Sequence, residues 1–241
     1  MDIKNNLKIF VDFDGTITTT DVGEEFFLKF GDPEEADKII KRWLAYEITS
    51  TEMWRELCDT IQNFDMEEYE KFLSTIELDE AFHKFVEFCA EHDLDYMIVS
   101  DGFDFYIDRI LERENLGHIK RVTNKLTLDE NGKLVPSFPH TDEECSRCAN
   151  CKRNQVILNS SDEDFTLYIG DGWSDTCPVQ HCDYILAKNS LLKFCEKNRI
   201  SYFPYNNFHN VLRRLNELVN KKRLKKRHQA LLKRKEVYRR G

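Results

Sequence analysis

The sequence predicts an α/β protein in which helices cover a parallel β-sheet, a helical insertion follows the first strand, and a β-hairpin comes later. Short apolar runs at residues 7–11, 95–100 and 165–169 alternate with segments whose apolar residues recur at helical spacing. This alternation favours a parallel sheet with both faces covered. Roughly 55 residues of helical pattern follow the first run. Asn131-Gly132, between alternating residues, is typical of a hairpin turn.

The first elements are supported by spacing and by residues that end helices. Phe26, Phe27 and Phe30 recur at helical spacing within the insertion, and Pro33 suits the first position of the next helix. The expected elements, in chain order, are a strand at 7–11, helices within 22–72, a helix at 80–91, a strand at 95–100, a helix at 103–112, the hairpin within 121–140, a helix at 152–158, a strand at 165–169, a helix at 174–180, a strand at 184–187, a helix at 190–197, a strand at 200–203 and a helix at 208–219.

The composition suits a polar surface around a buried core. The chain has 241 residues, of which 41% are hydrophobic and 33% charged, enough for one medium domain or a core with a smaller insert. We expect no membrane span, because no apolar run reaches the ~18 residues that crossing a bilayer requires. The N-terminal stretch MDIKNNLK lacks the apolar middle of a signal peptide, so we expect a cytoplasmic protein.

The net charge of -9 hides an asymmetry. Residues 221–241 hold 11 Lys and Arg but one acid, so the rest of the chain carries 24 basic and 43 acidic side chains. An acidic body repels nucleic acid, and only the tail is left for such a contact. We therefore expect no nucleic-acid partner. The favoured interpretation of the tail is a solvated or frayed helical extension that can fold against the acidic body. The non-enzymatic alternative is a regulatory or nucleic-acid-binding protein that acts through the tail.

Polar side chains follow three of the predicted strands. Asp12 and Asp14 come after the first, Ser100 ends the second and Asp171 follows the third. Ligands of parallel sheets bind beyond the carboxyl ends of the strands, so we expect these side chains at one edge of the sheet.

Four stretches in this order resemble the haloacid dehalogenase superfamily of phosphohydrolases: DFDGT at 12–16, IVS ending at Ser100, Lys152 near a helix start, and IGDGWSD at 169–175. The resemblance extends to about residue 205 and implies a Rossmann-like core at residues 1–16 and 77–215. It also implies a small helical cap at 17–76, which leaves 216–241 as a basic helical tail.

The chemistry of phosphate esters supports this resemblance. An anionic ester resists an anionic attacker, so hydrolysis needs a held nucleophile, neutralisation of charge and a proton donor. A carboxylate nucleophile divides the reaction into two steps through an aspartyl-phosphate, and Asp12 is the candidate. Asp14 falls on the same side of an extended chain, where it can protonate the leaving group and then deprotonate water.

Clustered carboxylates that face a phosphate require a cation, and Mg²⁺ is bound through few carboxylates, waters and phosphate oxygens. By resemblance, Asp12 and Asp171 supply side-chain ligands and Asp14 its backbone carbonyl. Asp175 supports the site through water or by pairing with Lys152.

The resemblance also assigns phosphate binding. Ser100 and Thr16 would donate hydrogen bonds to the phosphoryl oxygens, and Lys152 would neutralise charge on the nucleophile and the phosphoryl group. Gly15 and nearby backbone N–H groups complete the phosphate cradle.

Further features indicate a branch of the superfamily. The position of the helical insertion is similar to that of the phosphoserine-phosphatase-like branch. VDFDGTITTTD, the hairpin ending FPH and CANCKRNQVI resemble the methionine-salvage phosphatases, which act on 2-hydroxy-3-keto-5-methylthiopentenyl-1-phosphate. Asp21 stands where phosphoserine enzymes carry a substrate-binding glutamate, so it is a candidate substrate contact.

One position departs from that branch. Ser100 is followed by Asp101 instead of glycine, which is similar to the phosphoethanolamine and phosphocholine phosphatases. An acid there would pair with a substrate ammonium. Gly23 stands where that group carries its second acid, which counts against it. The expected order of substrates is the salvage intermediate, an amino-alcohol phosphate and then phosphoserine.

Three of the eight cysteines lie close together in the sequence. With no export signal, the eight cysteines are expected to be reduced. Cys145, Cys148 and Cys151, with His140, have the ligand types of a tetrahedral structural Zn²⁺ site, and their spacing also resembles part of an iron–sulfur run. Reduced thiols beside the cationic Lys152 are the favoured interpretation.

Overall fold

The computed structural model describes residues 6–143 and 147–240. The chain forms two compact units, one of Met1–Ile17, Leu78–Val99 and Lys152–Gly241 and one of Thr18–Glu77 and Ser100–Cys151. We call them the first and the second unit. Hydrogen bonds link seven strands in the order β4-β3-β2-β1-β5-β6-β7, and strand β2 (Asp95–Phe103) runs from the first unit into the second. The predicted α/β class is confirmed.

The first unit is built on parallel strands. β1 (Leu7–Val11) pairs with the start of β2 on one side and with β5 (Phe165–Gly170) on the other, and β6 (Tyr184–Ala187) and β7 (Phe203–Pro204) extend the sheet beyond β5. The register places Val11 beside both Ile98 and Ile169. The residues that follow β1 and β5 therefore emerge at the same edge.

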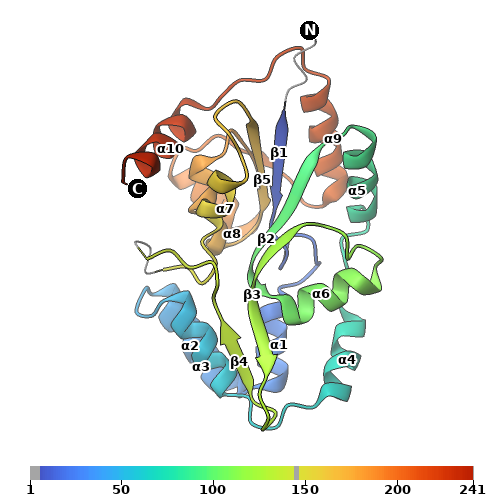
Figure 1. Ribbon diagram of the computed structural model, residues 1–241, viewed down its shortest axis with the longest axis vertical. Helices are drawn as coiled ribbons and strands as arrows, with labels where there is room; N and C mark the ends of the chain where they lie inside the picture. Colours follow the sequence, from blue (N-terminus) through green and yellow to red (C-terminus); the bar gives the residue numbers. More distant parts are fainter. Residues whose placement is uncertain (1–5, 144–146, 241) are drawn as a thin grey trace. The chain divides into compact units, whose positions relative to one another are not determined.

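Helices lie on both sides of these strands, with α5 (Phe82–Glu91) and α9 (Phe208–Val219) on one side (Figure 1). Helices α7 (Lys152–Leu158), α8 (Asn189–Lys197) and α10 (His228–Arg240) lie on the other. Phe82, Phe85 and Phe208 join α5 to α9, with ring centroids between 5.1 and 5.6 Å apart and every ring fully buried. Burial of one such side chain stabilises the fold by about 1.5–3 kcal/mol.

The second unit combines helices with an antiparallel hairpin. Its helices are α1 (Val22–Phe30), α2 (Pro33–Leu44), α3 (Ser50–Asp59), α4 (Met66–Thr75) and α6 (Asp104–Arg113), and its hairpin consists of β3 (Arg121–Leu128) and β4 (Leu134–Ser137). Asp32 caps α2 and Pro33 occupies its first turn, as expected. The hairpin turn contains Gly132 at φ +75°, a left-handed conformation that glycine adopts without strain.

Two predicted elements of the first unit differ from the structure. Residues 174–180 form two short 3₁₀ turns, η1 (Trp173–Asp175) and η2 (Pro178–His181), because the Asp175 side chain bonds the backbone of its own loop and Pro178 starts a new turn. The strand expected at 200–203 is only β7. Residues 199 and 200 instead terminate α8: Arg199 has φ +54°, and the Ile200 amide donates to the Cys195 carbonyl. The strand therefore starts only at Phe203.

The basic tail docks on the first unit. Leu224, Ala230 and Arg234 are buried. The Arg227 guanidinium donates to the carbonyls of Val179 and Cys182, and its amide donates to the Asp183 carboxylate. The tail therefore folds against the rest of the first unit, and most of its lysines stay exposed. The division into core (1–16, 77–215), cap (17–76) and tail (216–241) stays a prediction. The two units group the tail with the first and residues 100–151 with the second.

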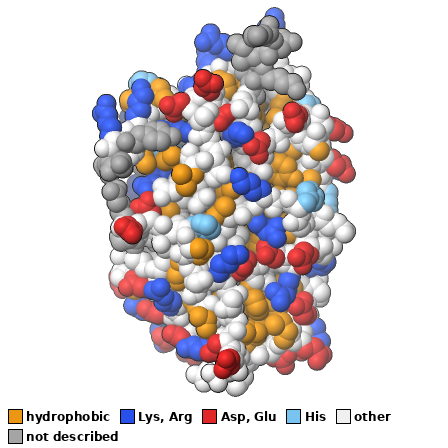
Figure 2. Space-filling model, viewed as in Figure 1, with side chains coloured by type: hydrophobic (Ala, Val, Ile, Leu, Met, Phe, Trp, Pro, Cys, Tyr) orange, Lys and Arg blue, Asp and Glu red, His pale blue; other side chains and the backbone are white. Residues whose placement is uncertain are grey.

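The face drawn in Figure 2 is polar and mixed in charge. Acidic and basic side chains are interspersed over the face in Figure 2, and hydrophobic side chains are scattered between them. Scattered apolar exposure of this kind is ordinary for a globular protein. Within the described part of the chain, no helix combines the length and the hydropathy needed to span a bilayer.

Candidate active site

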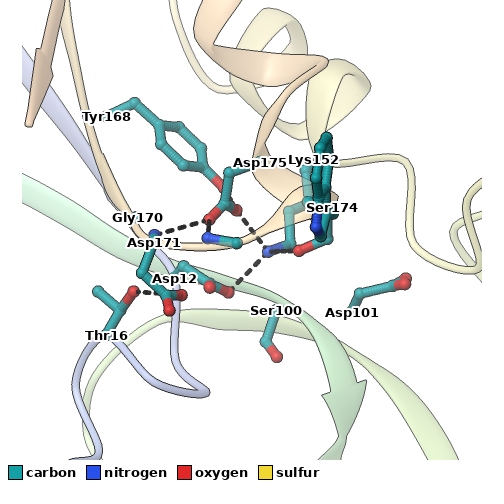
Figure 3. A network of polar contacts seen from close by, with 12 residues as sticks. Asp12, Thr16, Ser100, Asp101, Lys152, Tyr168, Gly170, Asp171, Ser174 and Asp175 are labelled. Atoms are coloured by element: carbon teal, nitrogen blue, oxygen red, sulfur yellow. Dashed lines mark hydrogen bonds and ion pairs between the residues drawn. The ribbon is translucent and has the colours of Figure 1, made fainter. Parts of the chain in front are cut away.

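A buried lysine joins two carboxylates at the edge of the first unit's sheet (Figure 3). Lys152, the first residue of α7, is 2% exposed, and its ammonium donates to Asp12 Oδ1 at 2.6 Å and to Asp175 Oδ1 at 2.8 Å. It also donates to Ser174 Oγ at 2.9 Å. Asp12 follows β1 directly, is 4% exposed, and its amide donates to the Ile169 carbonyl at 2.9 Å. The pairing of β1 with β5 thus brings the two motifs together.

Asp175 is fully buried, and both of its carboxylate oxygens are occupied. Besides Lys152, the Tyr168 hydroxyl donates to Oδ1 at 2.7 Å. The amides of Asp171 and Gly172 donate to Oδ2 at 3.0 and 3.1 Å. A carboxylate has about four lone-pair directions, and here four donors use them. Asp175 is therefore placed to hold the loop and Lys152, as the supporting role predicted for it requires.

Asp171 is less buried and is held from two sides. Thr16 Oγ1 donates to its Oδ1 at 3.3 Å, and Asn189 Nδ2 donates to its Oδ2 at 3.1 Å. Its backbone carbonyl accepts from the Leu191 amide at 2.9 Å and the Ser190 hydroxyl at 3.2 Å. These contacts come from the loop after β1 and the start of α8, so two other segments of the first unit hold Asp171.

The loop after β1 requires glycine at position 15. Gly15 has φ +66°, and a Cβ there would lie 2.8 Å from Asp171 Oδ2. The loop turns at once, because the amides of Thr16 and Ile17 both donate to the Phe13 carbonyl. Asp14 lies on this turn and is partly exposed, and its acid–base role stays a prediction.

The charges of the cluster act strongly on one another. Burial raises the pKa of Asp12 well above its usual value, and the nearby carboxylates of Asp175 and Asp171 add to the rise against the lowering effect of Lys152. Burial acts to lower the pKa of Lys152, but Asp12 and Asp175 outweigh it and keep the amine protonated. A raised pKa disfavours the ionised form of Asp12, so the cluster favours a further positive charge.

The residues present fit a hard divalent cation. Asp12, Asp171 and Asp175 have one oxygen each within 4.8 Å of the others, the only such group among the described residues. These carboxylates outnumber the ammonium of Lys152, so the group favours another cation. Four donors already occupy the Asp175 carboxylate, so Asp12 and Asp171 are the side chains that we expect to bind a metal, and all-oxygen ligation suits Mg²⁺.

Ser100 and Asp101 belong to the second unit, at the point where the chain enters it along β2. The buried Ser100 Oγ accepts from the Gly102 amide at 2.9 Å, and Asn150 Nδ2 donates to the Ser100 carbonyl at 2.7 Å. Asp101 is 9% exposed, and its Oδ1 accepts from the Asn150 amide at 2.6 Å. The predicted phosphate contact of Ser100 and substrate contact of Asp101 stay predictions.

Asp21, the other predicted substrate contact, also has a local structural role. It is the N-cap of α1, and its Oδ1 accepts from the Glu24 amide at 2.9 Å. An N-cap of this type contributes about 1 kcal/mol to a helix. Substrate binding by Asp21 stays a prediction.

The predicted zinc set is incomplete in the structure, because Cys145 lies outside the described residues. The Cys151 amide donates to the His140 carbonyl at 2.8 Å. His140, Cys148 and Cys151 do not gather their side-chain ligand atoms in one group within residues 6–143 and 147–240. The structure therefore lends no support to a structural Zn²⁺.

Three residues near the cluster were missed by the sequence interpretation. Ser174 lies inside the stretch IGDGWSD, two residues after Gly172. Its contact with Lys152 could have been predicted from that position in the motif. Tyr168 lies within a strand, and Asn189 lies 18 residues after Asp171, so neither has a local signal. Only the packing of β5 and β6 shows their roles.

Comparisons with known proteins agree with this geometry. Residues 7–199 match the model of the family described as "Putative Phosphatase". Two relatives named 2-hydroxy-3-keto-5-methylthiopentenyl-1-phosphate phosphatase come from Bacillus mycoides strain KBAB4 and Bacillus thuringiensis strain Al Hakam. They are 33% and 31% identical to this chain, over 90% of its length and 99% of theirs.

Solved structures share the fold. A phospho-aspartyl intermediate analogue of phosphoserine phosphatase superposes with a TM-score of 0.65 at 18% identity, covering 86% of this chain and 97% of that one. A HAD family hydrolase from Salmonella enterica serovar Typhi gives 0.68 at 15% identity, covering 86% and 70%. With the family match and the named relatives, these findings establish that the chain belongs to the haloacid dehalogenase superfamily and is a phosphomonoesterase.

Proposed function

We propose that this phosphatase is Mg²⁺-dependent and hydrolyses 2-hydroxy-3-keto-5-methylthiopentenyl-1-phosphate, an intermediate of methionine salvage, through an aspartyl-phosphate on Asp12. One observation carries the reaction type: the buried ammonium of Lys152 lies between the carboxylates of Asp12 and Asp175. A buried carboxylate held by a lysine, beside a second acid with room for a cation, is what phosphoryl transfer to a carboxylate requires.

In the first step, an oxygen of Asp12 attacks phosphorus as the bond from phosphorus to the leaving oxygen breaks. Asp14 gives its proton to that oxygen, which departs as an alcohol or enol. Lys152 donates to Asp12 at 2.6 Å, so it is placed to hold the attacking carboxylate and to offset charge on the phosphoryl group. Thr16, Ser100 and the backbone near Gly15 are assigned to the phosphoryl oxygens.

In the second step, Asp14 takes a proton from water, and the resulting oxygen attacks the phosphorus of the aspartyl-phosphate. The bond between Asp12 and phosphorus breaks, inorganic phosphate leaves, and the carboxylate of Asp12 returns. Asp14 ends protonated, ready for the next substrate. Each residue thus recovers its starting state, and water is the only co-reactant.

The proposal assigns the cation to Asp12, Asp171 and the carbonyl of Asp14. Bound there, Mg²⁺ supplies positive charge that favours the ionised nucleophile and offsets the charge of the phosphoryl oxygens. Asp175 stays outside the ligand set, because four donors already use its oxygens.

The substrate choice has support from the named relatives and from two residues of the second unit. The amino-alcohol phosphate alternative needs Asp101 to meet an ammonium, but this carboxylate is 9% exposed and bonded to Asn150. It also needs an acid at position 23, where a Cβ on Gly23 would lie 3.2 Å from Trp54 and 3.3 Å from the Tyr106 hydroxyl. Both observations favour the salvage intermediate over phosphoethanolamine and phosphocholine.

A phosphate-release screen tests the proposal. The enzyme with Mg²⁺ is given the enol phosphate, phosphoethanolamine, phosphocholine and phosphoserine in parallel, and Asp12→Asn is the inactive control. We expect the highest kcat/KM for the enol phosphate. A higher value for an amino-alcohol phosphate would replace this substrate, and equal phosphate release by Asp12→Asn would reject Asp12 as the nucleophile.

A further inference from the structure

Asp101 belongs to a buried hydrogen-bonded bracket in the second unit. The bracket joins three segments: Ser100 and Asp101 on β2, Val122 and Asn124 on β3, and Asn150 in the loop before α7. Asp101, Asn124 and Asn150 are each at most 9% exposed. The sequence offers no sign of it, since its members lie 23 and 49 residues apart from Asp101.

The bracket uses Asp101 twice. Its Oδ1 accepts from the Asn150 amide at 2.6 Å and more weakly from Asn124 Nδ2 at 3.5 Å, and its carbonyl accepts from Asn124 Nδ2 at 2.6 Å. A bond from a backbone amide to an ionised, buried carboxylate is among the stronger hydrogen bonds of a protein. Asp101 therefore holds the loop of Asn150 through a short bond to the main chain.

Asn150 completes the bracket from the other side. Its Nδ2 donates to the Ser100 carbonyl at 2.7 Å and to the Val122 carbonyl at 3.1 Å. Ser100, a predicted phosphate contact, is thus held by its carbonyl and is the direct neighbour of Asp101. Along the chain, Lys152 follows Asn150 by two residues. The bracket therefore fixes the backbone beside Ser100 and the backbone two residues before Lys152.

We propose that Asp101 is a positioning residue that, through Asn150 and Asn124, holds the backbone beside Ser100 and the loop that leads into Lys152. Its carboxylate accepts hydrogen bonds within this bracket and does not contact the substrate. The loss of Asp101 therefore slows phosphoryl transfer for every substrate and leaves the preference among leaving groups unchanged. This inference rests on the phosphatase activity and is independent of the substrate proposed above.

The test compares Asp101→Asn and Asn150→Ala with a matched control, Asp164→Asn. Asp164 is 4% exposed, lies in the first unit, and accepts from the Ser161 amide at 2.7 Å and from the Asn6 side chain. It is therefore another buried aspartate with a backbone and an asparagine partner, outside the bracket. Activity is measured with p-nitrophenyl phosphate and phosphoethanolamine, and amide hydrogen exchange is followed over residues 147–158.

We expect Asp101→Asn and Asn150→Ala to lower kcat by about tenfold on both substrates, with the ratio of the two kcat/KM values unchanged. Exchange over residues 147–158 should accelerate in both variants and stay at the wild-type rate in Asp164→Asn. The double variant should lose little more than either single one, because both break the same bracket.

Two outcomes would overturn the inference. A selective rise of KM for phosphoethanolamine in Asp101→Asn would make the residue a substrate contact. If Asp101→Asn and Asp164→Asn lose the same thermal stability and the same fraction of kcat, Asp101 contributes to stability alone. If the enol phosphate is not hydrolysed in the earlier screen, this test still stands, because the kinetic measurements use p-nitrophenyl phosphate and phosphoethanolamine.

Discussion

Asp12 and Asp101 are both buried aspartates in loops or strands at the carboxyl end of parallel strands, yet their surroundings are opposite. Asp12, in the first unit, has one ammonium at 2.6 Å and shares its site with the carboxylates of Asp171 and Asp175. Asp101, in the second unit, is bonded to amide N–H groups of two asparagines. One environment surrounds a carboxylate with like charges, and the other satisfies it with hydrogen bonds.

The difference shows that burial by itself does not mark a reactive acid. A carboxylate satisfied by amide donors is held in one place. A carboxylate that is buried among like charges has a raised pKa, and a nearby cation would favour its ionised form. The hydrogen-bond and charge partners of a buried aspartate therefore indicate whether its role is chemical or structural.

The largest effect should come from Asp12→Asn. The change removes the proposed nucleophile and one negative charge but keeps the shape of the side chain. We expect turnover with Mg²⁺ and p-nitrophenyl phosphate to fall by at least about 10⁴-fold. The thermal midpoint should stay at or above that of the wild type, because repulsion from Asp171 and Asp175 is relieved. A variant with a tenth of wild-type turnover would contradict the role of Asp12.

The second effect should come from Lys152→Met. This change leaves Asp12 and Asp175 as buried carboxylates without their common cation, which costs about 3–5 kcal/mol of unfolding free energy. Urea denaturation at pH 7.5 measures the loss. The control is Lys8→Met, since Lys8 pairs with the exposed Asp95 and should contribute less than about 1 kcal/mol. Equal losses in the two variants would refute the buried bridge.

His181 shows how burial acts on a basic side chain, where Asp12 and Asp101 are acidic. Burial lowers the pKa of His181 to about 4. Below pH 6.5 the unfolded chain binds a proton at His181 and the folded chain does not. The free energy of unfolding therefore decreases as the pH is lowered from 6.5 to about 4. From pH 6.5 to pH 5, this group lowers the free energy of unfolding by about 1.5 kcal/mol.

The measurement is urea denaturation at pH 6.5 and 5 for the wild type, His181→Gln and His118→Gln. His181→Gln should lose less stability between the two pH values than the wild type. His118 is exposed, so His118→Gln should retain the wild-type dependence. A wild-type dependence in His181→Gln would show that other groups cause it.

The smallest effect concerns the support of Asp171 by Asn189. Asn189 has φ +48° and donates to Asp171 Oδ2 at 3.1 Å, so it keeps a side chain where the backbone favours glycine. Asn189→Gly should weaken Mg²⁺ binding about three- to tenfold by calorimetry, since partners of ligand carboxylates orient them. Its thermal midpoint should not fall.

The matched control is Asn115→Gly. Asn115 has φ +60° and lies in the second unit, so glycine relieves the same backbone conformation without touching Asp171. Mg²⁺ affinity should then equal that of the wild type. Equal affinities in both variants would mean that Asn189 does not orient the carboxylate.

Most of the fold and the members of the acid cluster could be predicted from local pattern. Strands show as apolar runs and helices as apolar spacing, so β1, β2, β5 and β6 were expected close to where they lie. The failures have local causes that pattern does not carry. The helix expected at 174–180 became two 3₁₀ turns, because the Asp175 side chain competes for the backbone of its loop.

The sequence by itself determined which carboxylates meet. Parallel strands place the residues that follow them at one edge of the sheet, so the strand pattern alone predicts that Asp12 and Asp171 lie together. The glycine and the threonine of DFDGT belong to the same short loop, and their proximity follows from chain connectivity.

Only the tertiary structure shows which donors each of these side chains meets. Lys152 reaches Asp12 across 140 residues, and Asn150 reaches Asp101 across 49. Such partners depend on how helices and strands pack, because a local pattern specifies which face of an element is buried but not what it meets. For this reason the sequence left Asp101 as a candidate substrate contact, and the packed structure shows it bonded to Asn150 in the second unit.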